Sequence, residues 1–125
     1  MKVPENLLYT KEHEWISKKD NVVKVGITDF AQSQLGDIIF LELPEVGDQI
    51  VAGESFGEIE AVKTVSELYA PINGTILEVN EDLEDSPDNI NQDCYGTGWI
   101  IKVRHEGNLE SDDLLDHKEY SNLVE

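Results

Sequence analysis

Cysteine is nearly absent, since Cys94 is the only one among 125 residues. A single thiol cannot form an intrachain disulfide, so any dithiol chemistry would have to come from a group other than cysteine side chains. This scarcity is typical of a protein from a reducing compartment.

Long hydrophobic runs are absent as well, because no stretch approaches the roughly 20 apolar residues that span a bilayer. The first residues also lack the apolar core of a secretory signal and the arginines of a mitochondrial transit peptide. We therefore expect a cytoplasmic protein, or one that has already been processed, with no membrane partner.

Positive charge is scarce: 9 basic residues stand against 27 acidic ones, which gives a formal net charge of −18. Such acidity repels phosphates and anionic lipid headgroups, so it argues against a nucleic-acid or membrane-surface role. A basic protein surface is the more suitable partner, unless the acids serve only to keep the chain soluble and monomeric. The length suits one domain, residues 1–125.

Five short segments rich in β-branched residues predict a mainly β protein. They are residues 22–27, 38–43, 56–62, 72–79 and 99–103. The second segment is apolar on both faces, so we expect it to be a central strand. In the third, Ile59 and Ala61 alternate with two glutamates that should face solvent. Within the fourth, the Asn73-Gly74 pair predicts a hairpin turn.

Two further segments predict helices. Thr28 can cap a helix over residues 29–35, with Gly36 as the left-handed residue that ends it. A broken apolar stripe over residues 109–124 predicts one or two short helices in the tail. Residues 80–91, which are rich in acids, predict an exposed loop.

No sequence pattern supports catalysis or metal binding. The three histidines, His13, His105 and His117, lack metal-ligand spacing and have no cysteine beside them, so we interpret them as ordinary surface histidines. The glycines form no nucleotide-binding fingerprint, and carboxylates are so common that a close acid pair carries little weight. We therefore expect neither an enzyme nor a metal site.

Lys63 is the one cation between Lys24 and Lys102. Small or β-branched neighbours on both sides predict that it lies at the tip of a tight hairpin. A modifying enzyme could recognise such a protruding lysine, and acylation would remove its charge. An ordinary surface lysine paired with Glu60 or Glu67 is the alternative that the residues alone leave open.

The chain resembles the H proteins of the glycine cleavage system over nearly its whole length. The motifs that carry the resemblance are Lys11-Glu12-His13-Glu14-Trp15, Gly26-Ile27-Thr28-Asp29-Phe30-Ala31-Gln32, Leu35-Gly36-Asp37-Ile38 running on to Leu43-Pro44, Gly57-Glu58-Ile59-Glu60-Ala61-Val62-Lys63, Tyr69-Ala70-Pro71-Ile72-Asn73-Gly74 and Tyr95-Gly96-Thr97-Gly98-Trp99. The resemblance implies that Lys63 carries lipoate, covalently attached as lipoyl-lysine. The departures are Cys94, where the family usually has proline, and Ala61, where it more often has serine; we expect neither to affect attachment.

The resemblance implies a lipoyl-bearing shuttle rather than an enzyme. Such a shuttle takes an aminomethyl group from the pyridoxal-phosphate glycine decarboxylase, passes it to the tetrahydrofolate-dependent aminomethyltransferase, and is reoxidised by dihydrolipoamide dehydrogenase. A lipoate-attaching enzyme is the fourth partner. The redox-active sulfurs would arrive with the cofactor, which agrees with the single cysteine of the chain.

The resemblance also implies a flattened antiparallel barrel-sandwich hybrid, with the lipoyl-bearing hairpin at about residues 56–72, a short helix near residues 28–35 and a C-terminal helical segment. In the family, the loaded arm folds against the protein surface. Glu14 and Glu67 are our candidates for the cleft that receives it, because a carboxylate could hold the aminomethyl ammonium by a charge-assisted hydrogen bond. Solvated surface acids are the alternative.

Several related functions remain to be weighed. A biotin carrier is disfavoured, because that family usually has methionine on both sides of its lysine, where this chain has Val62 and Thr64. Lipoyl domains of 2-oxoacid dehydrogenases are shorter and lack both end motifs. An H-like lipoyl-relay or regulatory protein and an unlipoylated acidic interaction module are the alternatives that the sequence leaves open.

Overall fold

The structure is a computed structural model, which describes residues 2–105 and 114–124. The strands are β1 (Leu8–Tyr9), β2 (Glu14–Lys19), β3 (Val22–Ile27), β4 (Ile38–Glu42), β5 (Gln49–Ile50), β6 (Ser55–Ala61), β7 (Val65–Tyr69), β8 (Gly74–Val79) and β9 (Ile101–His105). The helices are α1 (Asp29–Leu35), α2 (Asp82–Asp85), α3 (Asn89–Gln92) and α4 (His117–Val124). No helix in the described residues is long and apolar enough to cross a membrane.

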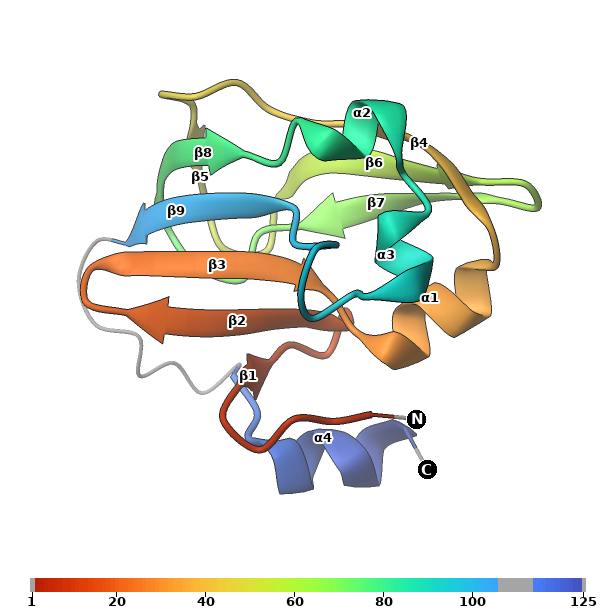
Figure 1. The fold of residues 1–125 in the computed structure, drawn as a ribbon. Helices are drawn as coiled ribbons and strands as arrows, with labels where there is room; N and C mark the ends of the chain where they lie inside the picture. The colour runs from red at the N-terminus through yellow and green to blue at the C-terminus, as the bar shows by residue number, and fades with distance from the viewer. Residues whose placement is uncertain (1, 106–113, 125) are drawn as a thin grey trace.

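The strands form two antiparallel sheets that pack against each other (Figure 1). The larger sheet has six strands in the order β1-β2-β3-β9-β8-β5, and the smaller has three in the order β4-β6-β7. Helix α4 lies beside β1 and the N-terminal segment, away from the smaller sheet (Figure 1). This mainly β sandwich with short helices and a C-terminal helix confirms the predicted fold class.

The core lies between the two sheets, and alternating side chains from each sheet pack into it. Val23 and Val25 of β3 are fully buried, as the alternation in that segment predicts. Ile59 and Leu68 bury their side chains from the smaller sheet, and Ile101 completes the cluster from β9. Each such side chain stabilises the fold by roughly 1.5–3 kcal/mol relative to an exposed position.

Helix α1 forms where the sequence predicts it. The Thr28 hydroxyl accepts a hydrogen bond from the Ala31 N–H at 3.2 Å, which satisfies one of the free donors of the first turn. At the other end, Gly36 has a φ of +82° and its N–H donates to the Gln32 carbonyl. Both caps are therefore confirmed.

The described part of the tail, residues 114–124, contains one helix, α4, and Tyr120 packs it against the rest of the protein. The ring of Tyr120 is fully buried and stacks on Tyr9 with the ring centroids 4.6 Å apart. Trp15 and Leu7 complete this second apolar cluster. The expected apolar position at Leu109 lies outside the described residues.

The prediction that residues 38–43 form a central strand is wrong. β4 is an edge strand that pairs with β6 alone, and its register shifts between Ile38 and Phe40. Ile38 is buried, whereas Ile39 and Phe40 are 50% and 57% exposed. Apolarity on both faces usually indicates burial on both faces, but here one face meets solvent.

The hairpin predicted at Asn73-Gly74 is also wrong, because β8 pairs with β9 and β5 and not with β7, the strand that precedes this pair of residues. Gly74 is the first residue of β8, and a side chain there would collide with the Arg104 carbonyl of β9. The glycine therefore permits close strand approach. The Asn73 side chain accepts a hydrogen bond from the Ala52 N–H at 2.8 Å.

Residues 80–91 are not the exposed loop that their acids predict. They include α2 and α3, which bury Leu83 and Ile90 at 1% and 0% exposure. The acids occupy the outer side of these short turns, while one apolar residue in each reaches the core. The final strand, β9, also begins two residues later than predicted, at Ile101.

Candidate functional site

The turn between β6 and β7 presents Lys63 to solvent, which confirms the predicted hairpin tip. The Ala61 N–H donates to the Thr64 carbonyl at 2.8 Å and closes the turn. The Val62 N–H donates to the Asp37 carbonyl at 3.0 Å, so the turn is fastened to the segment that precedes β4. In Figure 1 the hairpin extends beyond the rest of the sandwich.

Lys63 has no carboxylate partner within the part of the chain that the structure describes. The one ion pair found there joins Lys102 Nζ to Glu78 Oε2 at 3.1 Å, on the other sheet. Pairing of Lys63 with Glu60 or Glu67, the alternative considered from the sequence, therefore finds no support.

A cavity of about 150 Å³ lies beside the strand that leads away from the hairpin. Glu14 and Glu67 both contribute to its wall. The rest of the lining is mainly apolar and comes from α1 and the two sheets: Ile27, Phe30, Ala31, Leu35, Ile59 and Leu68. Since Glu67 lies four residues beyond Lys63, it is about 13 Å along the strand from the tip. The structure thus brings both candidate cleft residues to one cavity.

Glu14 is buried, so the alternative of a solvated surface acid is wrong for this residue. The residue is only 2% exposed. Its carboxyl accepts hydrogen bonds from the Thr10 hydroxyl at 2.7 Å and the Tyr69 N–H at 3.4 Å. Burial raises the pKa of Glu14 to about 8 despite these two bonds, with a smaller contribution from Glu12. The carboxyl is therefore mostly neutral at pH 7.

Glu67 lines the same cavity as Glu14 but differs from it in burial and in hydrogen-bond partners. It is exposed, and its carboxylate accepts a hydrogen bond from the Tyr69 hydroxyl at 3.0 Å. That bond, with the negative charge of Glu67, raises the pKa of Tyr69. A solvated acid at the rim of the cavity describes Glu67 well, so the two candidates would play unequal roles.

The loop that positions Glu14 is held by the distant helix α4. His13 adopts a φ of +70°, and its Nδ1 lies 2.8 Å from the Tyr120 hydroxyl. The same hydroxyl lies 2.6 Å from Thr28 Oγ1. His13 is half-buried between Phe30 and Tyr120, and burial lowers its pKa, so it is not the ordinary surface histidine that the sequence predicts.

Sequence reasoning missed this support because His13 and Tyr120 lie 107 residues apart. No local pattern links them.

The thiol of Cys94 is buried at 6% exposure. Burial, followed by the charge of Asp29, raises the pKa of Cys94 to about 12. A protonated thiol is a poor nucleophile, so Cys94 is not suited to exchange with a dithiol arm.

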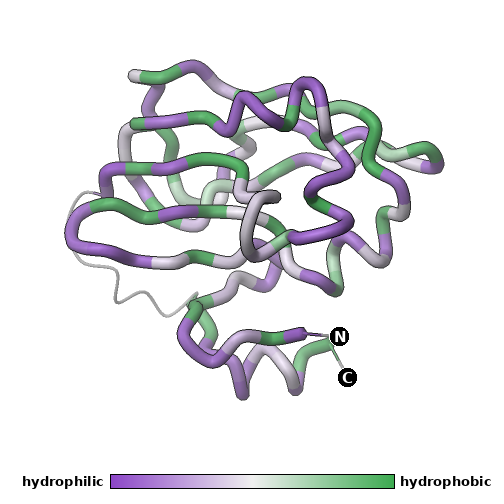
Figure 2. The backbone as a smooth tube through the Cα atoms, in the orientation of Figure 1, coloured by the Kyte–Doolittle hydropathy of each residue, from purple (hydrophilic) through white to green (hydrophobic). Residues whose placement is uncertain are grey.

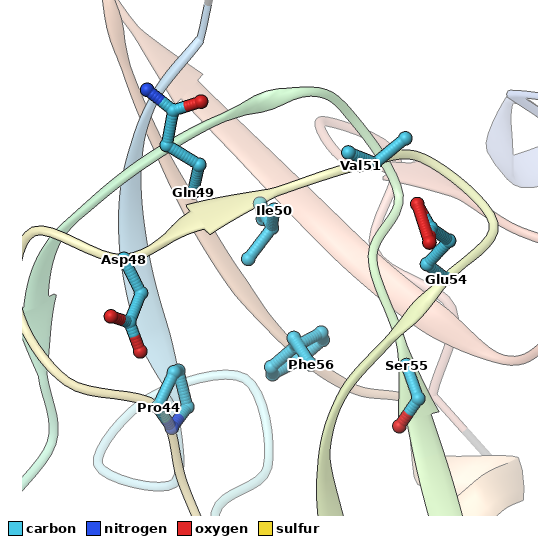
Figure 3. A pocket seen from close by; sticks show the side chains of 8 residues that line it. All are labelled: Pro44, Asp48, Gln49, Ile50, Val51, Glu54, Ser55 and Phe56. Atoms are coloured by element: carbon cyan, nitrogen blue, oxygen red, sulfur yellow. The ribbon is translucent and has the colours of Figure 1, made fainter.

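A larger hollow of about 370 Å³ lies at the opposite end of β6 (Figure 3). Asp48, Glu54 and Ser55 border it, and no histidine is among the residues that line it. Ser55 is eight residues from Lys63, or about 26 Å along the strand. No group of three potential metal ligands occurs in the described residues. The hairpin and its neighbouring cavity are therefore the best candidate site.

An antiparallel sandwich that presents one accessible lysine on a hairpin turn, beside a cavity with a buried carboxyl, is the architecture of a carrier domain with a lysine-borne arm. Residues 7–125 match the sequence profile of the family described as Glycine cleavage H-protein. The chain belongs to this family.

Individual relatives match over nearly their full length. The chain is 53% identical over 124 residues to the glycine cleavage system H protein of Bacillus licheniformis, covering 99% of this chain and 98% of that protein. It is 53% identical over 123 residues to the H protein of Carboxydothermus hydrogenoformans, covering 98% and 95%. A crystal structure of the H protein of Mycobacterium marinum matches with a TM-score of 0.90 and 44% identity, covering 96% of this chain and 97% of that one.

Proteins of this family are non-catalytic carriers that bear a lipoyl-lysine in the glycine cleavage system. Membership therefore argues against the biotin carrier and the unlipoylated acidic module. The name that these relatives share also favours the glycine cleavage role over a lipoyl relay.

Proposed function

We propose that residues 1–125 act as a single lipoyl-carrier domain in which Lys63 is the attachment lysine. As a glycine cleavage H protein, the chain carries the aminomethyl group from the glycine decarboxylase to the aminomethyltransferase and is reoxidised by dihydrolipoamide dehydrogenase. The observation that carries the assignment of Lys63 is its position: an exposed amine at the tip of a tight turn, with no carboxylate partner in the described residues.

The residues around the site fit a lysine-borne lipoyl group. Lys63 Nζ is free to form the amide, and the lipoyl group would supply the disulfide and thiol chemistry that the protein itself lacks. The small side chain of Ala61 and the exposed side chains of Val62 and Thr64 leave the tip accessible to an attaching enzyme. The family match supports the cofactor, whereas the choice of lysine is our proposal.

Glu14 and Glu67 form the proposed cleft for the loaded arm. Glu14 lines the mainly apolar cavity, and an incoming ammonium within hydrogen-bond distance of its neutral carboxyl would stabilise the ionised form. A charge-assisted hydrogen bond of this kind is about twice as strong as a neutral one. The apolar lining from α1 and Leu68 would exclude water from the cargo.

We also propose that the protein works in the cytoplasm. The supporting observations are the bacterial origin of its relatives, the single reduced cysteine and the absence of a spanning helix from residues 2–105 and 114–124.

The assignment of Lys63 is tested by incubating the protein with lipoate, ATP and a lipoate ligase, followed by intact and peptide-level mass measurement. We expect one lipoyl increment on Lys63 in the wild type and none in Lys63→Arg, which keeps the charge but cannot form the amide under these conditions. Lys11→Arg, a matched change of another exposed lysine, should be modified like the wild type. A folded wild type that stays unmodified by an active ligase would refute the assignment.

A further inference from the structure

The outer face of the three-stranded sheet carries two rows of side chains that cross all three strands. Strand register places Phe40, Glu60 and Val65 directly opposite one another in the row nearer the hairpin tip. The next row consists of three glutamates that are likewise directly opposite: Glu42, Glu58 and Glu67. We call these two rows, together with Ile39 and Val62, the hairpin face.

The apolar side chains of the hairpin face are unusually exposed. Seven large apolar side chains in the described residues are well exposed to solvent, and four of them belong to this face. They are Ile39 at 50%, Phe40 at 57%, Val62 at 68% and Val65 at 56% exposure. Figure 2 shows hydrophobic colour along β4 and at the hairpin beside it. Glu60 separates Phe40 from Val65 in their row, but a group of exposed apolar side chains on one face marks an interaction site more often than scattered ones do.

The glutamate row has an energetic cost in the isolated protein. Like charges that face each other across neighbouring strands are destabilising. None of the three glutamates forms an ion pair within the described part of the chain, and Lys63 is the only basic residue in β4, β6, β7 or the turn between them. A partner that brings cations to this row would relieve the repulsion.

We propose that the hairpin face docks onto the glycine decarboxylase, at an entrance that combines an apolar patch with a rim of lysine or arginine side chains. The proposal rests on the proposed function, because it requires that the lysine beside this face carries the lipoyl arm. The exposed apolar side chains of the face would meet the apolar patch, and its glutamates, Glu60 among them, would meet the basic rim.

Charge separates this partner from the enzyme that attaches lipoate to Lys63. Acylation removes the positive charge of Lys63 beside the face, so a basic rim suits the lipoylated protein better than the unmodified one that an attaching enzyme must bind. The oxidised arm presented to the decarboxylase is itself uncharged and offers little for recognition. After loading, the cargo ammonium has the cleft of Glu14 as a partner on the carrier itself.

Two variants of the lipoylated protein test the surface. Phe40→Ser removes the largest exposed apolar side chain, and Glu58→Gln removes the central charge of the glutamate row. Val46→Ser and Glu81→Gln are matched controls, because Val46 is 67% exposed and Glu81 is also exposed, and both lie outside the hairpin face. Lipoylation of each protein is first measured by mass, and glycine decarboxylation by the holoenzyme then gives KM and kcat for the carrier.

We expect Phe40→Ser to raise KM about tenfold and Glu58→Gln to raise it about threefold, with kcat nearly unchanged at saturation. The Glu58→Gln variant should also show a weaker rise of KM with added salt than the wild type, because it has one fewer charge to screen. Both control variants should match the wild type.

Several outcomes would overturn the docking surface. Lipoylated Phe40→Ser and Glu58→Gln with the KM of their controls would refute the surface while leaving Lys63 as the carrier lysine. Slower lipoylation with an unchanged decarboxylase KM would assign the face to the attaching enzyme instead, and loss of self-association in Phe40→Ser would assign it to a second copy of the chain. Absence of lipoylation at Lys63 in the wild type would refute the proposed function itself.

Discussion

The two sheets differ in whether like charges that face each other across strands have an oppositely charged partner. In the six-stranded sheet, Lys24 lies opposite Lys102, which in turn lies opposite Glu78 and forms an ion pair with it. In the three-stranded sheet, Glu42, Glu58 and Glu67 lie opposite one another with no cation between them. Opposite charges across strands stabilise a sheet, and like charges destabilise it. In the larger sheet Glu78 therefore offsets the repulsion between Lys24 and Lys102, whereas the glutamate row of the smaller sheet has no such partner in the described residues.

The two sheets also differ in how deeply their apolar side chains are buried, and substitutions to alanine should show this difference as a difference in stability. Ile101→Ala in the larger sheet removes a fully buried side chain and should lower the free energy of unfolding by about 2–5 kcal/mol. Val65→Ala on the smaller sheet removes one that is 56% exposed and should change it by less than about 0.5 kcal/mol. Urea denaturation at a single pH measures both.

Equal losses in the two variants would contradict this difference, since they would mean that Val65 also supports the core. Val51→Ala is a useful control, because Val51 is 51% exposed and lies outside both sheets, and it should behave like Val65→Ala.

Glu14 belongs to β2 of the larger sheet and lines the cavity to which the smaller sheet also contributes. The pH dependence of stability tests whether its carboxyl is buried there. Burial raises its pKa from an ordinary value of 4.5 to about 8. The folded state therefore holds the proton more tightly than the unfolded state, and this stabilising contribution is complete below pH 4.5 and is lost as the pH rises through 8.

Glu14→Gln mimics the neutral carboxyl and should remove that loss. Relative to the variant, the wild type should lose on the order of a few kcal/mol of unfolding free energy between pH 5 and pH 9. Urea denaturation across this range measures the difference, and Glu67→Gln, at the exposed rim, should leave the wild-type slope intact. Parallel curves for Glu14→Gln and the wild type would mean that Glu14 is ionised in the cavity at neutral pH.

Regular alternation made much of the fold predictable. The apolar positions of β3, the cap of α1 at Thr28 and the hairpin around Lys63 all follow from local patterns that the structure confirms. β4 could not be predicted in this way, because its apolar outer side chains look like those of a buried strand until the pairing partners are known. Such a failure at a binding surface is expected, since local rules are broken most often where function requires it.

Prediction failed elsewhere for a different reason. The acids of residues 80–91 outnumber Leu83 and Ile90, so composition concealed the two side chains that reach the core. The Asn73-Gly74 pattern predicts a turn because glycine is conformationally free, whereas Gly74 in the structure lets β9 approach closely. In each case the deciding contact is with a segment remote in the sequence.

The candidate site was predictable to a similar degree. Lys63 stands out because cations are so rare in the middle of the chain. The pairing of Glu14 with Thr10 is local, but the support of His13 by Tyr120 depends on where α4 packs. A local pattern can therefore place the lysine, whereas Glu14 is a candidate through the family resemblance and only the fold shows that it is buried and what holds it in position.

A substitution within the glutamate row separates its effect on stability from its effect on docking. Glu58→Lys would place a cation between Glu42 and Glu67 and replace two repulsions by two attractions, so it should raise the free energy of unfolding by about 0.5–1 kcal/mol. The gain should shrink in 1 M salt, where exposed charges are screened. The same variant should bind the decarboxylase less well, because a lysine would then oppose the basic rim. A variant that is no more stable than the wild type at low salt would show that the row is not strained, and the relief of repulsion would then cease to be a reason for a basic partner.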